Sequence, residues 1–289
     1  MSKPVLPDRR LHAYRADLAD EKLRGRVDAP RYVKGEQRQV TAPVLPVRRG
    51  PRFDSTLDTE ALLGETVTVF DESEGWAWVQ IARDGYVGYM PSEGLSHKIL
   101  APTHRVAALR TYVYLEPDGK APALGLLSLN ARVTVEAEDG KFLALAGGGY
   151  IPARHAVPEG ALALDHVALA ESFLGAPYLW GGRTSVGLDC SGLVQLAAEA
   201  TGHFCPRDAD MQAAELGTLV EPSAHRRGDL VFWEGHVGIM TSADDLLHAN
   251  AHHMAVELEP FVRARERIKA AGYEVICVRR LPRKRGQPF

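Results

Sequence analysis

The chain has 289 residues, of which 25% are charged and 45% are hydrophobic, the composition of an ordinary globular protein. One core rarely organises a chain of this length, so we expect two or three domains. The net charge of −3 gives no reason to expect nucleic acid or an anionic membrane surface as a partner.

Cysteine usage and targeting features point to a reducing compartment. Three cysteines are a small and odd number, which does not favour a disulfide framework. Residues 1–23 contain no apolar core of a secretory signal, and no apolar run approaches the roughly 18 residues of a membrane span. We therefore expect a cytoplasmic protein without a membrane span, and the sequence does not indicate its oligomeric state.

Residues 1–40 are polar and weakly periodic, and they form a predicted N-terminal segment with at most one short helix near residues 17–23. From residue 41 the pattern changes to short β-type runs between turn residues. The strands predicted here cover residues 65–70, 75–82 and 85–91, and Asp84-Gly85 is a hairpin signal. We predict a small all-β domain over residues 41–100.

This strand pattern recurs in residues 131–152, where strand, acidic turn, strand, Gly-rich turn and an aromatic-apolar-Pro ending follow in the same order. Two units of about 55 residues indicate a tandem of small SH3-like barrels, the second covering residues 101–158. The glycines at residues 147–149 are predicted to form a hairpin turn rather than a phosphate loop, because no helix follows them.

After residue 158 the hydrophobic period becomes helical. The predicted helices cover residues 162–174, 190–202, 209–216 and 261–271. The predicted strands cover residues 229–234, 236–241, 245–250, 254–259 and 273–279. Helices followed by an antiparallel run of strands indicate an α+β domain over residues 159–289.

Cys190 opens one of these predicted helices and directly follows a Gly-rich turn. A thiol at a helix N-terminus faces unpaired backbone N–H groups and the positive end of the helix dipole. Such sites lower a cysteine pKa from about 8.5 to roughly 3.5–7.5, and the thiolate is the reactive form. The sequence thus predicts that Cys190 is a nucleophile. The alternative is an inert buried thiol, which we expect for Cys205 and Cys277.

A cysteine nucleophile needs an imidazole within hydrogen-bond reach and a polar group that orients the ring. His236 begins a predicted strand, and His248 lies in the next strand. Neighbouring antiparallel strands bring such side chains within reach of each other. We therefore predict that His236 is the general base and then acid, and that His248 orients it. Taken singly, either one is more simply a structural histidine.

Metal chemistry is the competing interpretation, since the chain has 11 histidines and His248, His252 and His253 lie close together. No C-x-x-C pair or H-E-x-x-H helix supplies the spacing of a zinc site. We therefore expect no metal and no cofactor, and we place His252 and His253 in the turn between two strands.

Three blocks of sequence resemble the NlpC group of papain-like cysteine peptidases. They are PYLWGGRTSVGLDCSG at residues 177–192, RRGDLVFWEGHVGIM at 226–240 and LLHANA at 246–251, in the order and spacing of that family. The resemblance begins near residue 161 and extends to the two SH3-like units before it. It implies a multidomain fold of two small all-β SH3-like barrels followed by an α+β papain-like (NlpC-type) catalytic domain.

The family hydrolyses amide bonds in bacterial cell-wall peptides, commonly the bond from γ-D-glutamate to a diamino acid. A closer resemblance is to its SH3-bearing γ-D-glutamyl-L-diamino acid endopeptidases, which act on peptides with a free N-terminal L-Ala. Their PRDA motif stands at residues 206–209. The resemblance implies that Asp208 pairs with the substrate ammonium. Asp208 could instead cap the helix that follows it, and Arg207 could pair with a neighbouring acid.

The same resemblance implies further substrate contacts. Tyr178 and Trp180 would line the S2–S1 side of the site, with Tyr178 near the reacting carbonyl. The other residues implied in substrate binding are Arg207, Asp189 and Ser191, together with Glu65 and Tyr86 from the first SH3-like unit.

We therefore expect a cysteine endopeptidase that cleaves the γ-D-glutamyl-diamino acid bond of murein peptides (L-Ala-γ-D-Glu-diamino acid) in murein peptide recycling. One alternative is a secreted or phage-type hydrolase of intact peptidoglycan, anchored by its SH3-like units. Another is a non-catalytic binding protein that uses those units alone, which the set of Cys190, His236 and His248 disfavours.

Overall fold

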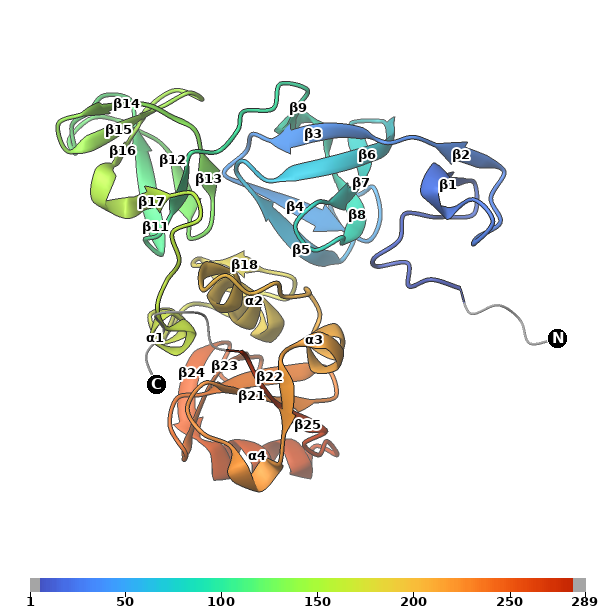
Figure 1. Ribbon diagram of the computed structural model, residues 1–289, viewed down its shortest axis with the longest axis vertical. Coiled ribbons are helices and arrows are strands. Elements are labelled where there is room, and N and C mark those ends of the chain that lie inside the picture. Colours follow the sequence, from blue (N-terminus) through green and yellow to red (C-terminus); the bar gives the residue numbers. More distant parts are fainter. Residues whose placement is uncertain (1–5, 283–289) are drawn as a thin grey trace. The chain divides into compact units, whose positions relative to one another are not determined.

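The computed structural model describes residues 6–282, and its contacts divide the chain into two compact units (Figure 1). Of the described residues, unit 1 combines the segment up to Val106 with residues 111–127 and 131–156, and unit 2 combines residues 107–110, 128–130 and the segment from Val157 onward. Unit 1 is built of strands, while the α-helices of the described residues lie in unit 2. The domain boundaries predicted after residues 40, 100 and 158 stay predictions.

Unit 1 contains a seven-stranded antiparallel sheet in the order β5-β4-β8-β7-β6-β3-β9. Its strands are β3 (Glu36–Val40), β4 (Val44–Arg48), β5 (Leu57–Leu62), β6 (Thr66–Ser73), β7 (Trp76–Ile81), β8 (Val87–Pro91) and β9 (Leu95–Ser96), with a 3-10 turn at Ser92–Gly94. β6, β7 and β8 confirm the three strands predicted in this region. Val67 and Val69 of β6 lie in one buried core with Val79 and Ile81 of β7, because alternate residues of a strand share a face.

Two details of this sheet extend the sequence prediction. The chain turns between β7 and β8 at Gly85, whose φ of 77° lies in the left-handed region that favours glycine. β3 pairs with β6, so residues 36–40 belong to the sheet although they precede the predicted start of the domain. Val40 explains this extension, because it is buried in the same core as Val67.

The segment near residues 17–23 forms a strand and one 3-10 turn rather than an α-helix. β1 (Leu18–Asp20) pairs in parallel with β2 (Arg31–Val33), and the 3-10 turn η1 follows at Glu21–Leu23. The Asp20 side chain accepts a hydrogen bond from the backbone N–H of Lys22, which caps this turn. Burial of the neighbouring Leu18 and Ala19 in two different clusters outweighs the weak helical pattern.

Most of residues 104–158 form two further sheets, ordered β13-β10-β17 and β12-β11-β16-β15-β14. Their strands are β10 (His104–Val106), β11 (Arg110–Tyr114), β12 (Ala123–Ser128), β13 (Arg132–Val133), β14 (Val135–Asp139), β15 (Phe142–Leu145), β16 (Tyr150–Pro152) and β17 (Ala156–Pro158), with a 3-10 turn at Ala153–His155. Val106, Leu143 and Ile151 pack in one core. Residues 147–149 turn the chain between β15 and β16, which confirms the predicted hairpin turn.

Unit 2 is built on a six-stranded antiparallel sheet in the order β20-β25-β21-β22-β23-β24. The strands are β20 (Thr218–Val220), β21 (Asp229–Trp233), β22 (His236–Met240), β23 (Asp245–Asn250), β24 (Ala255–Pro260) and β25 (Cys277–Arg280), and a separate hairpin joins β18 (Arg183–Thr184) to β19 (Gly187–Leu188). The helices are α1 (His166–Glu171), α2 (Cys190–Ala200), α3 (Ala209–Glu215) and α4 (Phe261–Ala270), with a 3-10 turn at Pro222–Ala224. The predicted α+β order of helices and antiparallel strands is confirmed.

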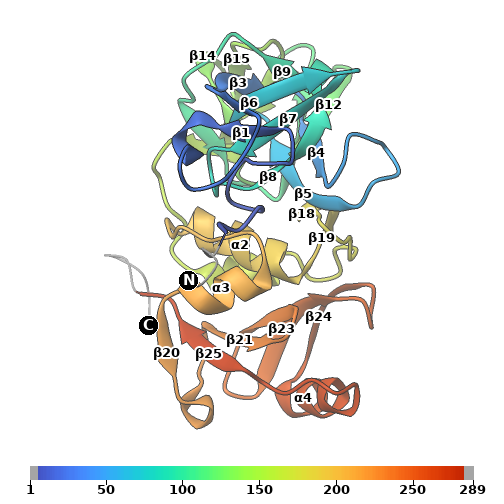
Figure 2. The ribbon, with the colours of Figure 1, turned by 90° about the vertical axis from the view of Figure 1, so that its right-hand side faces the viewer.

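Helices cover both faces of this sheet. Phe232 and Leu247 pack in a cluster with residues of α1 and α2, whereas their neighbours Trp233 and Leu246 pack with Phe261 of α4. Because adjacent residues of a strand point to opposite faces, α2 and α4 lie on opposite sides of the sheet. Figure 2 shows α2 and α3 on one side of the strands and α4 on the other.

Some element limits in unit 2 differ from the prediction. α1 begins four residues later than predicted, because Oδ1 of Asp165 accepts a hydrogen bond from the backbone N–H of Val167 at 2.9 Å and caps the helix there. β25 begins at Cys277 instead of residue 273. β18, β19 and β20 were not predicted, since two or three residues are too few to show a period.

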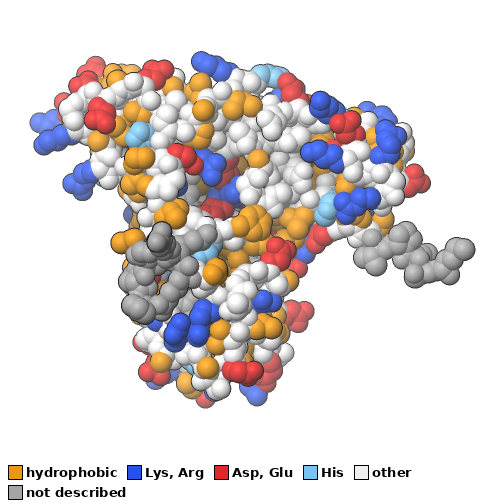
Figure 3. Space-filling view, viewed as in Figure 1, with side chains coloured by type: hydrophobic (Ala, Val, Ile, Leu, Met, Phe, Trp, Pro, Cys, Tyr) orange, Lys and Arg blue, Asp and Glu red, His pale blue; other side chains and the backbone are white. Residues whose placement is uncertain are grey.

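The surface of the described residues carries charges of both signs. On the face drawn in Figure 3, Lys and Arg side chains are interspersed with Asp and Glu side chains. Within residues 6–282, none of the helices has the length and apolar character needed to cross a membrane.

Candidate active site

The segment before Cys190 folds back on itself and leads into α2. The backbone N–H of Leu188 donates to the carbonyl of Pro177 at 3.1 Å, which closes a loop that contains Tyr178. The backbone N–H of Tyr178 donates to the carbonyl of Met254 at 3.0 Å, just before β24. Cys190 is the first residue of α2, as predicted.

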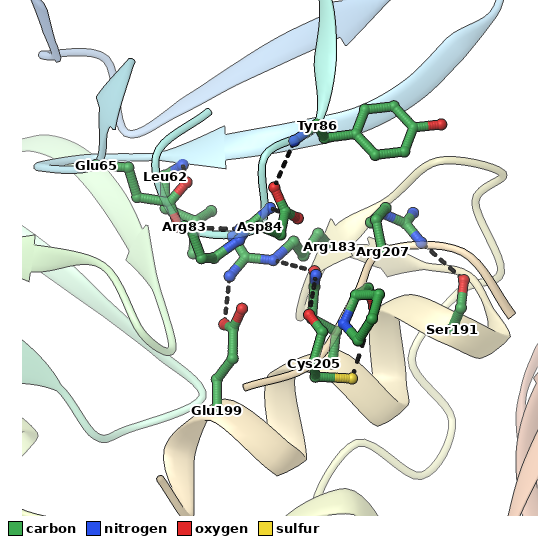
Figure 4. A network of polar contacts seen from close by, with 12 residues as sticks. Leu62, Glu65, Arg83, Asp84, Tyr86, Arg183, Ser191, Glu199, Cys205 and Arg207 are labelled. Atoms are coloured by element: carbon green, nitrogen blue, oxygen red, sulfur yellow. Dashed lines mark hydrogen bonds and ion pairs between the residues drawn. The ribbon is translucent and has the colours of Figure 1, made fainter. Parts of the chain in front are cut away.

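Asp189 caps α2 and forms a clamp with Arg207. Oδ1 of Asp189 accepts hydrogen bonds from the backbone N–H of Gly192 at 2.7 Å and from Arg207 at 2.9 Å. Oδ2 accepts from the backbone N–H of Gly181 at 2.9 Å and from Arg207 at 2.7 Å. The Arg207 guanidinium, only 1% exposed, also donates to Oγ of Ser191 at 2.8 Å (Figure 4). A bidentate pair of this kind fixes the geometry at the start of α2.

The Cys190 side chain is buried, with 7% of its surface exposed. Burial raises the pKa of its thiol to about 12, and the Asp189 carboxylate adds to the rise. A hydrogen bond from the backbone N–H of Val237 and the charge of Arg207 oppose this rise without cancelling it. The structure therefore differs from the expected thiolate. Desolvation outweighs the N–H groups at the helix end, so the thiol carries its proton at neutral pH.

His236 and His248 lie on neighbouring strands and share a hydrogen bond. His236 begins β22, His248 lies in β23, and Nε2 of His236 is 2.8 Å from Nδ1 of His248. Burial lowers the pKa of His236 to about 3, and the charge of His248 acts in the same direction. Burial also lowers the pKa of His248, while its hydrogen bond with Glu259 opposes that effect. Both rings are therefore neutral at neutral pH.

The thiol of Cys190 lies at the start of β22. The N–H group that bonds to it belongs to Val237, the residue that follows His236, and α2 packs against this strand. The structure thus brings Cys190, His236 and His248 to one region of unit 2. The catalytic roles predicted for them stay predictions.

Glu259 and Arg267 extend this arrangement and were not predicted from the sequence. Oε1 of Glu259 in β24 is 2.8 Å from Nε2 of His248 and also accepts a hydrogen bond from Arg267 in α4. His248 lies opposite Glu257, so Glu259 is its diagonal neighbour on the same face of the sheet. Identifying this contact requires the register of β23 and β24, which the sequence pattern alone does not supply.

Glu259 is ionised at neutral pH. Burial acts to raise the pKa of its carboxyl, but the hydrogen bond from His248 and the charge of Arg267 outweigh burial and hold the pKa below its usual range. An ionised carboxylate can only accept hydrogen bonds. Glu259 is therefore an acceptor for both of its neighbours.

The substrate-binding residues predicted in unit 2 occupy different environments. Tyr178 is half-buried and packs against the hydrophobic cluster that contains Cys190, and burial raises the pKa of its phenol to about 12. Trp180 is 59% exposed. Asp208 stands at the N-cap position of α3, but its side chain makes no capping hydrogen bond. Arg207 pairs with Asp189, and the substrate contacts predicted for these residues stay predictions.

Glu65 and Tyr86 lie in unit 1 and belong to one polar network (Figure 4). The Glu65 carboxylate accepts hydrogen bonds from the backbone N–H of Leu62 at 3.2 Å and from Arg83 at 3.0 Å. Arg83 also donates to Asp84 at 2.7 Å, and Asp84 accepts from the backbone N–H of Tyr86 at 3.1 Å. The network fixes the acid and the backbone of the tyrosine within unit 1; their predicted contacts with substrate stay predictions.

Among the described residues, His248, His253 and Glu259 could hold a metal ion, since their ligand atoms lie within 4.8 Å of one another. The Glu259 carboxylate is already paired with Arg267, whose charge would repel a cation. His252 and His253 lie in the turn between β23 and β24, as predicted. The expectation that the protein needs no metal or cofactor stays a prediction.

Two family models match the chain. The family described as "Bacterial dipeptidyl-peptidase Sh3 domain" matches residues 47–95, within the seven-stranded sheet of unit 1. The NlpC/P60 family matches residues 175–265, which include Cys190, both candidate histidines and Glu259. The SH3-like nature of residues 101–158 stays a prediction.

Relatives match most of the chain. It is 28% identical over 237 residues to "Gamma-D-glutamyl-L-lysine dipeptidyl-peptidase" of Bacillus cereus (strain ATCC 10987 / NRS 248), covering 71% of this chain and 70% of the relative. It is 29% identical over 232 residues to the protein of that name from Bacillus subtilis (strain 168), covering 73% of this chain and 78% of the relative. A crystal structure of an NlpC/P60 family protein from Bacillus cereus ATCC 10987 has the same fold, with a TM-score of 0.72, 22% identity and coverage of 86% of this chain and 100% of that one.

These matches, together with a cysteine at the head of a helix packed on an antiparallel sheet, define a cysteine peptidase. The chain carries an NlpC/P60 domain, matched over residues 175–265, and a bacterial dipeptidyl-peptidase SH3 domain ahead of it, matched over residues 47–95.

Proposed function

We propose that the protein hydrolyses the bond between γ-D-glutamate and a diamino acid in peptidoglycan-derived peptides with a free N-terminal L-Ala. The linked positions of Cys190, His236 and His248 carry this proposal. Two relatives are named gamma-D-glutamyl-L-lysine dipeptidyl-peptidase, and release of an N-terminal dipeptide agrees with a free L-Ala end. A role in murein peptide recycling is part of the proposal.

In the proposed reaction, the Cys190 thiol passes its proton to neutral His236 as the sulfur attacks the γ-carbonyl carbon of D-Glu. The backbone N–H of Cys190 and the Tyr178 hydroxyl stabilise the oxyanion. The His236 imidazolium then gives its proton to the leaving amine as the C–N bond breaks. A water molecule next transfers a proton to His236 and attacks the thioester, which releases L-Ala-γ-D-Glu. The proton on His236 returns to the sulfur.

The proposed substrate contacts are those of the site residues predicted from the sequence. Asp208 pairs with the L-Ala ammonium, because a carboxylate and an ammonium form charge-assisted hydrogen bonds. Tyr178 and Trp180 line the pocket beside it, and Glu65 and Tyr86 supply further contacts. The remaining predicted residues, Asp189, Ser191 and Arg207, act on binding through the clamp that holds the start of α2.

We also propose that residues 101–158 form a second SH3-like barrel. This is supported by the shared order of β14, β15 and β16 with β6, β7 and β8, each set being three consecutive antiparallel strands, and by the separate core of this region. A cytoplasmic site of action is proposed as well, and the free thiols of Cys190, Cys205 and Cys277 are compatible with it.

Replacing Cys190 with Ala is expected to abolish cleavage of an L-Ala-γ-D-Glu-diamino acid tripeptide, with a loss in kcat on the order of 10⁶-fold, as for other peptidase nucleophiles. Mass spectrometry of the released dipeptide measures this loss. Cys277→Ala removes a half-buried thiol outside the site and should remain active. Cleavage by Cys190→Ala at the parental rate would contradict the proposed function. Faster cleavage of intact peptidoglycan than of the tripeptide by the parent protein would favour a wall hydrolase.

A further inference from the structure

A series of hydrogen bonds leads from the candidate active site across the sheet to α4. Nε2 of His236 lies 2.8 Å from Nδ1 of His248, and Nε2 of His248 lies 2.8 Å from Oε1 of Glu259. Arg267 donates to the same Glu259 oxygen. His248 is fully buried, so both of its ring nitrogens are engaged by protein groups and neither reaches solvent.

The direction of each hydrogen bond follows from the chemistry at the Glu259 end. The ionised carboxylate can only accept, so Nε2 of His248 must carry the proton between them. A neutral imidazole has one N–H group, which leaves Nδ1 of His248 as an acceptor. Nδ1 of His248 therefore accepts a hydrogen bond from the N–H group at Nε2 of His236. The lone pair of the neutral His236 ring then lies on Nδ1.

Other charged or titratable groups near the two rings do not provide this constraint. His253 in the turn after β23 and Arg267 in α4 act on His248, and Asp189 at the start of α2 acts on His236. Arg267 has no acceptor atom. The group at hydrogen-bond distance from Nε2 of His248 is the Glu259 carboxylate.

We propose that Glu259 is a positioning residue that sets the tautomer of both histidines and leaves Nδ1 of His236 as the ring nitrogen that takes the proton from Cys190. The last step rests on the proposed function. The tautomers themselves can be measured without substrate, so the two can be tested separately.

Long-range ¹H–¹⁵N NMR spectra of histidine-labelled protein show which ring nitrogen carries the proton. In the parent protein, we expect the proton on Nε2 of both His236 and His248. A parent spectrum with His248 protonated on Nδ1 would overturn the proposal. Glu259→Leu removes the acceptor and should allow the Nδ1-protonated form of His248. It should lower kcat about 10- to 100-fold with little change in KM, as for loss of the outer partner of a metal-bound histidine.

Two further variants separate this role from a general effect on folding. Glu259→Gln keeps an acceptor oxygen, which Arg267 holds in place because it only donates, so the parental tautomer and most of kcat should return. Glu257→Leu removes a carboxylate that lies directly opposite His248 on the same strand pair, but it leaves the Glu259 carboxylate in place. The histidine tautomers and kcat should therefore both stay as in the parent protein. A Glu259→Gln protein as impaired as Glu259→Leu would overturn the acceptor argument.

The outcomes for Glu259 and for the proposed function are distinguishable. If Cys190→Ala is inactive while Glu259→Leu keeps the parental tautomer and kcat, the positioning role alone is rejected. If Cys190→Ala is active, the proposed function is rejected and the tautomer measurement still decides the part played by Glu259. Should Glu259→Leu fail to fold, the parent spectrum and the Glu259→Gln protein decide the question.

Discussion

Asp208 differs from the aspartates at the heads of the other helices in unit 2. The Asp165 and Asp189 side chains accept hydrogen bonds from backbone N–H groups at the start of α1 and α2. Asp208 stands before α3 and is half-buried, but its side chain makes no such bond. The alternative prediction, that Asp208 caps this helix, is therefore not supported by the geometry, and its pairing with a substrate ammonium stays a proposal.

Asp208→Asn keeps the size of the side chain and removes its charge. We expect kcat/KM on peptides with a free N-terminal L-Ala to fall about 10-fold or more, since leaving a charged group without its partner costs about 1–3 kcal/mol. Asp210→Asn changes an exposed carboxylate in the same helix and should have little effect. The measurement compares the cleavage rates of free and N-acetylated tripeptides. If the parent protein cleaved both tripeptides at the same rate, the proposed ammonium pocket would be contradicted.

Local patterns identify some of these residues and not others. The cysteine at a helix start and the two histidines at hairpin spacing are readable from the sequence, and the structure places Cys190 and both rings together. Glu259 could not be found in that way, because its contact depends on strand register and on a guanidinium from α4. The pKa of Cys190 was expected to fall and instead rises, because desolvation is set by tertiary burial.

The start of α2 depends on one buried ion pair. Asp189 caps the helix and binds Arg207 through both oxygens, and both residues are buried. The loop also approaches the first turn closely, since a Cβ on Gly192 would lie 2.5 Å from the carbonyl oxygen of Gly182. Neither contact leaves room for the helix start to shift, so Cys190 is held by its neighbours.

Asp189→Asn is expected to lower the free energy of unfolding of unit 2 by about 3–5 kcal/mol, because Arg207 would keep a buried charge without its partner. Hydrogen exchange of α2 amides across a urea series measures this change. Glu274→Gln breaks the exposed pair with Lys269 in the same unit and serves as the control, with little expected effect. If the two substitutions were equally costly, the clamp would not be a stabilising feature.

Elements whose hydrophobic pattern extends over several residues could be predicted from the sequence. Elements whose ends are fixed by caps or by packing could not. β6, β7 and β8 each run over five or more residues and are separated by turn residues, and the α2 helix has a clear start at Cys190. The start of α1 is set by the Asp165 cap, which the hydrophobic period does not show. Residues 18–20 form a strand because Leu18 and Ala19 enter two different clusters, a fact that only packing determines.

Buried histidines give unit 2 its expected dependence on pH. Burial lowers the pKa of His166, His236 and His248 from the ordinary value of 6.5. Below pH 6.5 the unfolded chain therefore binds more protons than the folded unit. The contribution of these groups to stability is complete above pH 6.5 and is lost progressively as the pH falls. In unit 1, burial lowers the pKa of the less buried His155 in the same way.

We expect the free energy of unfolding of unit 2 to fall between pH 7 and pH 5, by at most about 1.4 kcal/mol per pH unit for each histidine. Unit 1 should change less, and hydrogen exchange in urea resolves the two units.

His166→Asn keeps a donor for the carbonyl of Gly228, 3.0 Å away, and should weaken the pH dependence of the free energy of unfolding of unit 2. pH 5 lies above the range in which Asp165 and Glu259, whose carboxyl pKa values are lowered, take up protons. A unit 2 equally stable at both pH values would mean that the folded rings are protonated at pH 5, which would contradict the lowered histidine pKa values.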